Sequence, residues 1–199
     1  MKIQTILFYV MFGIALFICL KIYQDNKDTF SLKCIISSKD GNRYCVRDRE
    51  QVNKAVDLLA EVSIRCKTLV QKMKEKYPDD ERIKRMCSNF NPKKIMETLP
   101  TSELTAYSEN KGEKIAFCLN KTRNDDENLI DADTLTFVAL HELSHTMTKS
   151  IGHKQEFWEN FKFILINAKE FGIYQPKNYK KENREYCGMI IKDNPYYDL

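Results

Sequence analysis

The first twenty-odd positions of the chain are almost entirely apolar. No charged residue lies between Lys2 and Lys21, and positions 6–20 form an unbroken apolar run. A helix needs about 20 mainly apolar residues to span a bilayer, and Ile3 to Tyr23 has that length. A cleaved signal peptide would need a small-residue cleavage site after the run, and the polar sequence that follows offers none. The pattern predicts an uncleaved transmembrane signal anchor over residues 1–23, which contacts the membrane through residues 3–23.

The next segments change from a mixed to a helical pattern. Residues 24–47 are interpreted as a stalk and a small hairpin, with the turn at Lys39–Asn42. From Asp48 to Tyr77, apolar residues recur at three- or four-residue spacing, which predicts a core-facing helix that ends before Pro78. A shorter helix is expected over Asp80–Cys87.

Later segments alternate between β-prone and helical patterns. The runs 104–107 and 114–119 flank a Gly-containing turn and predict a hairpin. Residues 90–102 are interpreted as a connection with a helical turn, and residues 124–128 as an acidic loop.

The sequence TLTFVALHELSHTMTK at 134–149 is typical of a buried helix, capped by Asp133 or Thr134. The apolar positions from Phe157 to Ala168 predict a second helix packed behind it, with Trp158 interpreted as a core residue. Together these elements predict an α+β fold in which residues 48–199 form one small domain.

Charge narrows the range of partners. The 199 residues include 32 basic and 28 acidic side chains, for a net charge of +4. No cluster of Lys and Arg is interleaved with aromatic residues, so we expect no nucleic-acid partner. The oligomeric state has no signature in the sequence.

The cysteines bear on the compartment. Six lie outside the anchor: Cys34, Cys45, Cys66, Cys87, Cys118 and Cys187. An even number in a small domain suits disulfides in an oxidising compartment, although six cysteines allow 15 pairings. Six free thiols in a reducing compartment are the alternative.

The cysteine at 187 is expected to pair with Cys118 or another partner, and Asn120 begins an Asn-Lys-Thr glycosylation sequon. The positive-inside comparison is nearly balanced. The prediction is a single-pass protein whose domain lies on the lumenal, extracellular or virion-surface side.

The chemistry-bearing motif is His141-Glu-Leu-Ser-His145. Two histidines four residues apart share one face of a helix, where both can bind a single Zn²⁺ ion. Glu142 can reach a metal-bound water and act as general base without binding the metal. The chain has only three histidines, and the third is His153. Gly152 is expected to end the helix in the left-handed conformation and return His153 to the metal as third ligand.

Some assignments around this motif stay open. Glu156 is the rival third ligand, although it follows His145 too closely to lie on a separate packed helix. A tyrosine such as Tyr174 or Tyr179 is expected to stabilise the oxyanion, because no histidine is left for that role.

The motif and the Gly152–Trp158 segment (GHKQEFW) resemble those of zincin peptidases of the WLM and SprT-like families. The resemblance implies a helical layer, a short hairpin and a zinc helix, with Ile115–Leu119 as the strand edge that pairs with extended substrate. A small membrane-anchored zincin of this kind is also similar to proteins encoded by large DNA viruses. The longer His145–His153 spacing and the anchor depart from those families, which are often soluble and associated with repair of DNA–protein crosslinks.

The sequence therefore predicts a membrane-anchored zinc metallopeptidase that cleaves a protein or peptide substrate. The leading alternative is a membrane-tethered structural or binding protein with a zinc-stabilised domain and no turnover. A third hypothesis, a nucleic-acid-associated protease, would require stimulation by single-stranded DNA.

Overall fold

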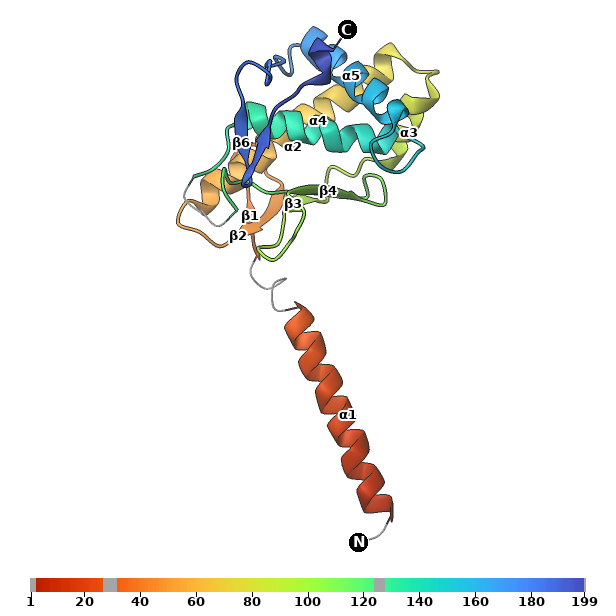
Figure 1. Ribbon diagram of the computed structural model, residues 1–199, viewed down its shortest axis with the longest axis vertical. Coiled ribbons are helices and arrows are strands. Elements are labelled where there is room, and N and C mark those ends of the chain that lie inside the picture. The colour runs from red at the N-terminus through yellow and green to blue at the C-terminus, as the bar shows by residue number, and fades with distance from the viewer. Residues whose placement is uncertain (1–2, 27–31, 124–127, 199) are drawn as a thin grey trace.

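The N-terminal helix lies apart from the rest of the chain. A computed structural model describes residues 3–26, 32–123 and 128–198, and Figure 1 shows helix α1 (Ile3–Asn26) leading away from the folded body. The stretch Leu7–Gln24 is long and apolar enough to cross a membrane, and none of it is buried against the protein. A membrane anchor and a signal sequence share this length and composition.

A hairpin packs beneath the body. Strands β1 (Leu32–Ile36) and β2 (Arg43–Arg47) pair antiparallel, which confirms the hairpin expected around the Lys39–Asn42 turn. Alternate residues of β2 enter the core, where Tyr44 and Val46 are buried. The carboxylate of Glu97, which is itself buried, accepts a hydrogen bond from the Arg47 amide (2.7 Å) and pairs with Arg49.

Two predicted scaffold helices are confirmed. Helix α2 (Val52–Lys76) buries the apolar stripe read from the sequence and ends just before Pro78. Helix α3 (Glu81–Asn89) begins where the Asp80 side chain accepts a hydrogen bond from the Arg82 amide, which is an N-cap.

A three-stranded sheet borders the helices. Its order is β3-β5-β4, with β3 (Ile95–Glu97), β4 (Ala106–Glu109) and β5 (Lys114–Phe117). The β4–β5 hairpin was expected, and β5 pairs antiparallel with β4 and parallel with β3.

Two sequence interpretations fail at this sheet. Residues 90–102 contain a strand, β3, where a helical turn was expected. The segment expected to form the substrate-facing edge, Ile115–Leu119, contains β5, which is the central strand with both edges paired. The edge strands are β3 and β4, and β4 is the one that lines the cleft.

The remaining elements close the fold. Helix α4 (Ala132–Met147) is buried on almost every side and packs against α2, α3 and α5 (Gln155–Glu170). Its N-cap is Asp131, one residue before the helix, and not Asp133 or Thr134 as expected. The chain ends with an unpredicted hairpin, β6 (Arg184–Tyr186) and β7 (Met189–Ile191), and the short helix η2 (Pro195–Tyr197). The described residues thus form a small mixed α+β body; of the loop expected at 124–128, they include only Asn128.

Candidate metal centre

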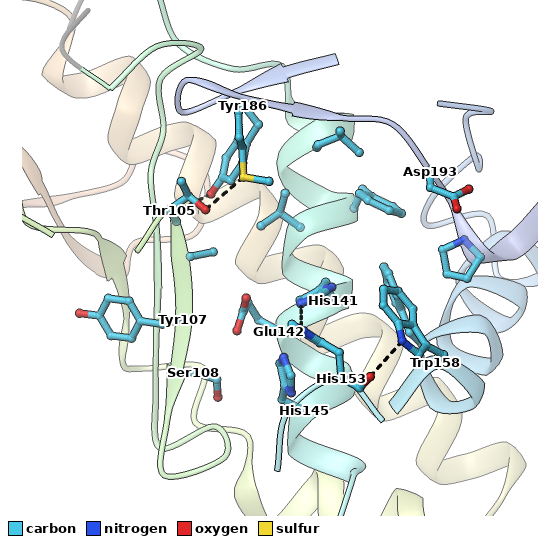
Figure 2. Close-up of a pocket in the computed structure, with 18 of the residues that line it drawn as sticks. Thr105, Tyr107, Ser108, His141, Glu142, His145, His153, Trp158, Tyr186 and Asp193 are labelled. Atoms are coloured by element: carbon cyan, nitrogen blue, oxygen red, sulfur yellow. Dashed lines mark hydrogen bonds between the residues drawn. The ribbon is translucent and has the colours of Figure 1, made fainter. Parts of the chain in front are cut away.

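The three histidines of the chain come together at one point. His141 and His145 lie one turn apart on α4, and His153 is brought against them by the loop between α4 and α5 (Figure 2). One ring nitrogen from each lies within 4.8 Å of the others. Nε2 of His153 is 3.0 Å from Nε2 of His141. The described residues therefore contain a cluster able to hold a metal ion.

The loop that carries His153 is held from both sides. The Lys111 ammonium donates to the Thr148 carbonyl (2.8 Å) and also to the carbonyl of Lys149. The Glu156 carboxylate accepts from the backbone amides of Lys149 (2.9 Å) and Ser150 (3.0 Å). These contacts satisfy backbone groups just beyond the end of α4 and fix the path of the chain toward the third histidine.

Glu156 therefore anchors the loop, and it is not part of the histidine cluster. Its two oxygens are engaged by backbone amides, and these hydrogen bonds lower the pKa of Glu156 to about 2. Gly152 has the expected positive φ of 78°. Gly152 does not end α4, because the helix already stops at Met147. That end is capped by a side chain: the Thr148 hydroxyl donates to the Ser144 carbonyl.

The β4–β5 turn fits closely against the end of α4. Gly112 has a φ of 119°, and a Cβ there would lie 2.7 Å from Cγ2 of Thr146 and 3.0 Å from a backbone oxygen of α3. Only glycine tolerates both this positive φ and this close approach. This close approach places Lys111 beside the carbonyls that it binds.

A buried phenylalanine supports all three imidazoles. The ring of Phe157 lies 4.4 Å from His145, 4.6 Å from His153 and 4.8 Å from His141, measured between ring centroids. The next residue, Trp158, donates from its indole nitrogen to the His153 carbonyl (3.1 Å). Trp158 was expected in the core, but it is 45% exposed and lines the cleft. Helical spacing predicted a buried position because neighbouring residues of α5 are buried.

Burial favours the neutral forms of the two motif histidines and of Glu142. Burial, assisted by the neighbouring imidazoles, lowers the pKa of His141 to about 3. Burial, assisted by His153 and the Lys111 ammonium, lowers the pKa of His145 to about 4. Both rings are therefore neutral at pH 7, with lone pairs available to a metal. Burial raises the pKa of the Glu142 carboxyl to about 8.

The cluster opens into a cleft of about 800 Å³. One side is β4, with Thr105 to Ser108 along it, and the others come from α5 and the C-terminal hairpin. The amide of Cys118 donates to the Thr105 carbonyl, so these two residues form a hydrogen-bonded pair of the β4–β5 ladder. In an antiparallel ladder such pairs alternate with pairs that share no hydrogen bond. The backbone groups of Ala106 and Ser108 consequently point away from β5. The cleft thus runs beside a sheet edge.

The tyrosines differ from the expectation. Tyr174 and Tyr179 are buried against Phe137, and their hydroxyls lie 3.3 Å apart. Neither lines the cleft, whereas Tyr107 and Tyr186 do. The Tyr186 hydroxyl donates to the Thr105 carbonyl (3.0 Å), at the start of β4. Sequence reasoning missed Tyr186 because its strand was not foreseen.

The cysteines divide into two disulfides and free thiols. Cys34 pairs with Cys45, and Cys118 pairs with Cys187, one of the partners expected for the tail. Cys66 and Cys87 are free, and Cys66 is buried.

The sequon does not provide an accessible glycosylation site in the fold. Asn120 has no exposed surface, and its side-chain oxygen accepts a hydrogen bond from Arg49 (2.8 Å).

Fold and site together define a small α+β protein with a three-histidine cluster at the base of a cleft. No protein-family model matches the chain. An uncharacterized protein of Acanthamoeba polyphaga mimivirus is 25% identical over 193 residues, covering 94% of this chain and 97% of that protein.

Shorter matches occur in two other viruses. An uncharacterized protein of Invertebrate iridescent virus 6 is 31% identical over 51% of this chain and 56% of its own length. A protein of Invertebrate iridescent virus 3, also uncharacterized, is 33% identical over 50% and 57%. Among solved structures, Wss1 from Saccharomyces cerevisiae is similar over 62% of this chain and 86% of its own, with 19% identity and a TM-score of 0.47. The viral relatives agree with the expected likeness to virus-encoded proteins.

Proposed function

We propose that this protein is a zinc-dependent peptidase tethered to a membrane by α1. His141, His145 and His153 hold the zinc ion, and Glu142 is the general base. The observation that carries the proposal is a buried carboxylate beside a three-imidazole cluster at the base of a cleft (Figure 2).

The donor set fits zinc. Imidazole nitrogen is a favoured zinc ligand, and the burial that keeps His141 and His145 neutral leaves their lone pairs free. Two nitrogens on a tetrahedral zinc ion lie about 3.4 Å apart, given a zinc–nitrogen distance of about 2.1 Å. The nitrogens here lie within 4.8 Å of one another, so small side-chain movements complete the site. Three protein ligands with a position open to the cleft are typical of catalytic zinc, whereas structural sites are closed by four.

The catalytic role of Glu142 follows from its place. Bound zinc supplies a Lewis acid and a water of lowered pKa. Glu142 follows the first ligand on α4 and lines the same cleft, where it can take a proton from the attacking water and give it to the leaving amine. The positive charge of the ion also opposes the burial that raises the pKa of Glu142, which favours the carboxylate that a base requires.

The edge of β4 suits a polypeptide substrate. Its outward backbone groups at Ala106 and Ser108 can pair with an extended segment, which would lie across the cleft as an added strand. The proposed partner is therefore a protein or peptide in extended conformation. Nucleic acid is not part of the proposal.

The location follows from two features outside the cleft. Helix α1 has the length and apolar character of a membrane anchor. The two disulfides favour an oxidising compartment. We place the catalytic domain on the lumenal, extracellular or virion-surface side.

A glutamate substitution tests the catalytic proposal against a zinc-stabilised domain without turnover. In full-length, zinc-loaded protein, Glu142→Gln should keep its zinc and lose cleavage of a diverse peptide mixture by roughly 10²–10⁴-fold. Glu159→Gln on α5 is the matched control, since that side chain bonds Gln155 on the helix surface. Zinc-loaded wild type without cleavage would favour the non-catalytic alternative, and an active Glu142→Gln protein would remove Glu142 as the base.

A further inference from the structure

The cleft contains an apolar recess on one side of the histidines. Along α4, the residues one turn before His141 are Phe137 and Val138, both of which are buried and line the cleft. Phe161 of α5 adds to this floor. The far end, next to His145, is lined by the polar Asn110, Lys111 and Ser150 and by the exposed Ile151. The cleft is thus chemically unequal along its length.

Two half-exposed side chains wall the recess. Trp158 on α5 is 45% exposed and Met189 on β7 is 47% exposed, and both line the cleft. Figure 2 shows Tyr186 above and to the left of His141 and Trp158 to its right, so the two side chains reach the site from different parts of the chain. Large apolar surface left in contact with water beside a concave site is typical of a ligand pocket.

The β7 wall is fixed in place. The Cys118–Cys187 disulfide joins the hairpin to the end of β5. The amides of Cys187 and Gly188 donate to the carbonyls of Asn120 (2.9 Å) and Lys121 (2.8 Å). The Tyr186 hydroxyl bonds the Thr105 carbonyl, so the wall is also tied to the start of β4. A wall held at this many points keeps its shape and can discriminate between side chains.

We propose that this recess takes one large apolar side chain of the substrate, adjacent to the bond that is cut. The inference rests on the proposed peptidase function and names its substrate class: extended segments carrying Leu, Met, Phe or a similar residue at one position beside the scissile bond. Substrates with a charged residue at that position are cut poorly, because the floor of Phe137, Val138 and Phe161 offers a charge no partner. The charged residues of this lining, Lys192, Asp193 and Asp198, belong to the C-terminal segment and not to the floor. A difference of about 10–200-fold in kcat/KM is expected between large apolar and small side chains.

The first test is a cleavage profile. Full-length zinc-loaded protein digests a diverse peptide mixture, and mass spectrometry locates the cut bonds. A large apolar residue should be enriched at one flanking position. Met189→Glu should lose that enrichment and accept Lys or Arg there instead. Ile166→Glu is the matched control, because Ile166 is 44% exposed on α5 and does not line the cleft.

The second test measures binding without turnover. Trp158 is the single tryptophan of the chain, so its fluorescence reports on the recess directly. In zinc-loaded Glu142→Gln protein, short peptides with Leu or Phe should change this emission at lower concentration than peptides with Asp or Ala. Adding Met189→Glu should weaken the response at least 10-fold; Met189→Ala, which adds no charge, should weaken it less.

The outcomes separate the two proposals. Apolar-selective binding without cleavage by the wild type would support the recess and contradict the peptidase function. Cleavage with no apolar preference, or a profile unchanged in Met189→Glu, would overturn the recess and leave the peptidase function standing. Absence of selectivity in both measurements would overturn the inference.

Discussion

At the scale of single residues, the geometry of the histidine cluster depends on side chains outside the cluster. Phe157 contacts all three imidazoles, and Glu156 with Lys111 sets the path of the loop that carries His153. The motif identifies His141 and His145, but the mutual position of the three rings comes from this support.

Shortening Phe157 should weaken both the fold and the metal site. Phe157→Ala should lower the free energy of unfolding of the metal-free protein by about 3–5 kcal/mol, because the side chain is fully buried. Phe157→Leu should cost less stability yet still weaken zinc binding, since it keeps bulk but loses the flat face against His145. Chemical denaturation and zinc titration measure the two effects. Zinc affinity unchanged in Phe157→Leu would remove the supporting role.

The Glu156 carboxylate should stabilise the protein only above acidic pH. Its pKa is lowered to about 2 in the folded protein from an ordinary 4.5. A depressed pKa means that the stabilisation is present above about pH 4.5 and is lost as the pH falls toward 2. The melting temperature of metal-free Glu156→Gln should therefore lie below that of wild type at pH 6 and approach it below pH 3. A pH-independent difference would contradict the charge-assisted anchoring.

At the scale of elements, long periodic segments were predictable and short ones were not. Helix α2 carries an apolar stripe from Val52 to Met73, and the β4–β5 hairpin has two β-prone runs about a glycine turn. Strand β3 has three residues, and it forms because β5 lies beside it, which a local pattern does not contain.

The site shows the same division. Helical spacing placed His141, Glu142 and His145 on one helix and a separate glycine-led segment brought in His153. It could not decide that Trp158 faces the cleft, because exposure depends on what packs against α5. The β6–β7 hairpin did leave a signal: Cys187 and Gly188, with φ values of 50° and 76°, form a two-residue turn of the kind that X-Gly pairs favour.

Removing the Cys118–Cys187 disulfide should cost more stability than removing Cys34–Cys45. The first closes a loop of 69 residues and the second a loop of 11. Loop-closure entropy then predicts losses of about 4 and about 3 kcal/mol for the paired Cys→Ser variants. In the former alone, amide hydrogens of β7 should exchange faster. Equal exchange in both variants would show that the hairpin needs no covalent tie.

At the scale of the whole molecule, the apolar helix α1 leads away from the folded body (Figure 1). That body contains two disulfides and the cleft. If α1 is an uncleaved anchor, the protein isolated from membranes should keep the mass of the full chain and resist alkaline extraction. Deletion of residues 2–26 should release the domain. A shortened chain in the soluble fraction of the secretory lumen would instead identify α1 as a cleaved signal.

The most direct measurement for the whole account is zinc content by mass spectrometry on the purified full-length protein, beside His153→Ala and the control Lys154→Ala. The account predicts about one zinc per chain in wild type and in Lys154→Ala, with most of it lost in His153→Ala. A folded wild-type protein without zinc, or a His153→Ala protein that binds zinc as well as wild type, would contradict the three-histidine site.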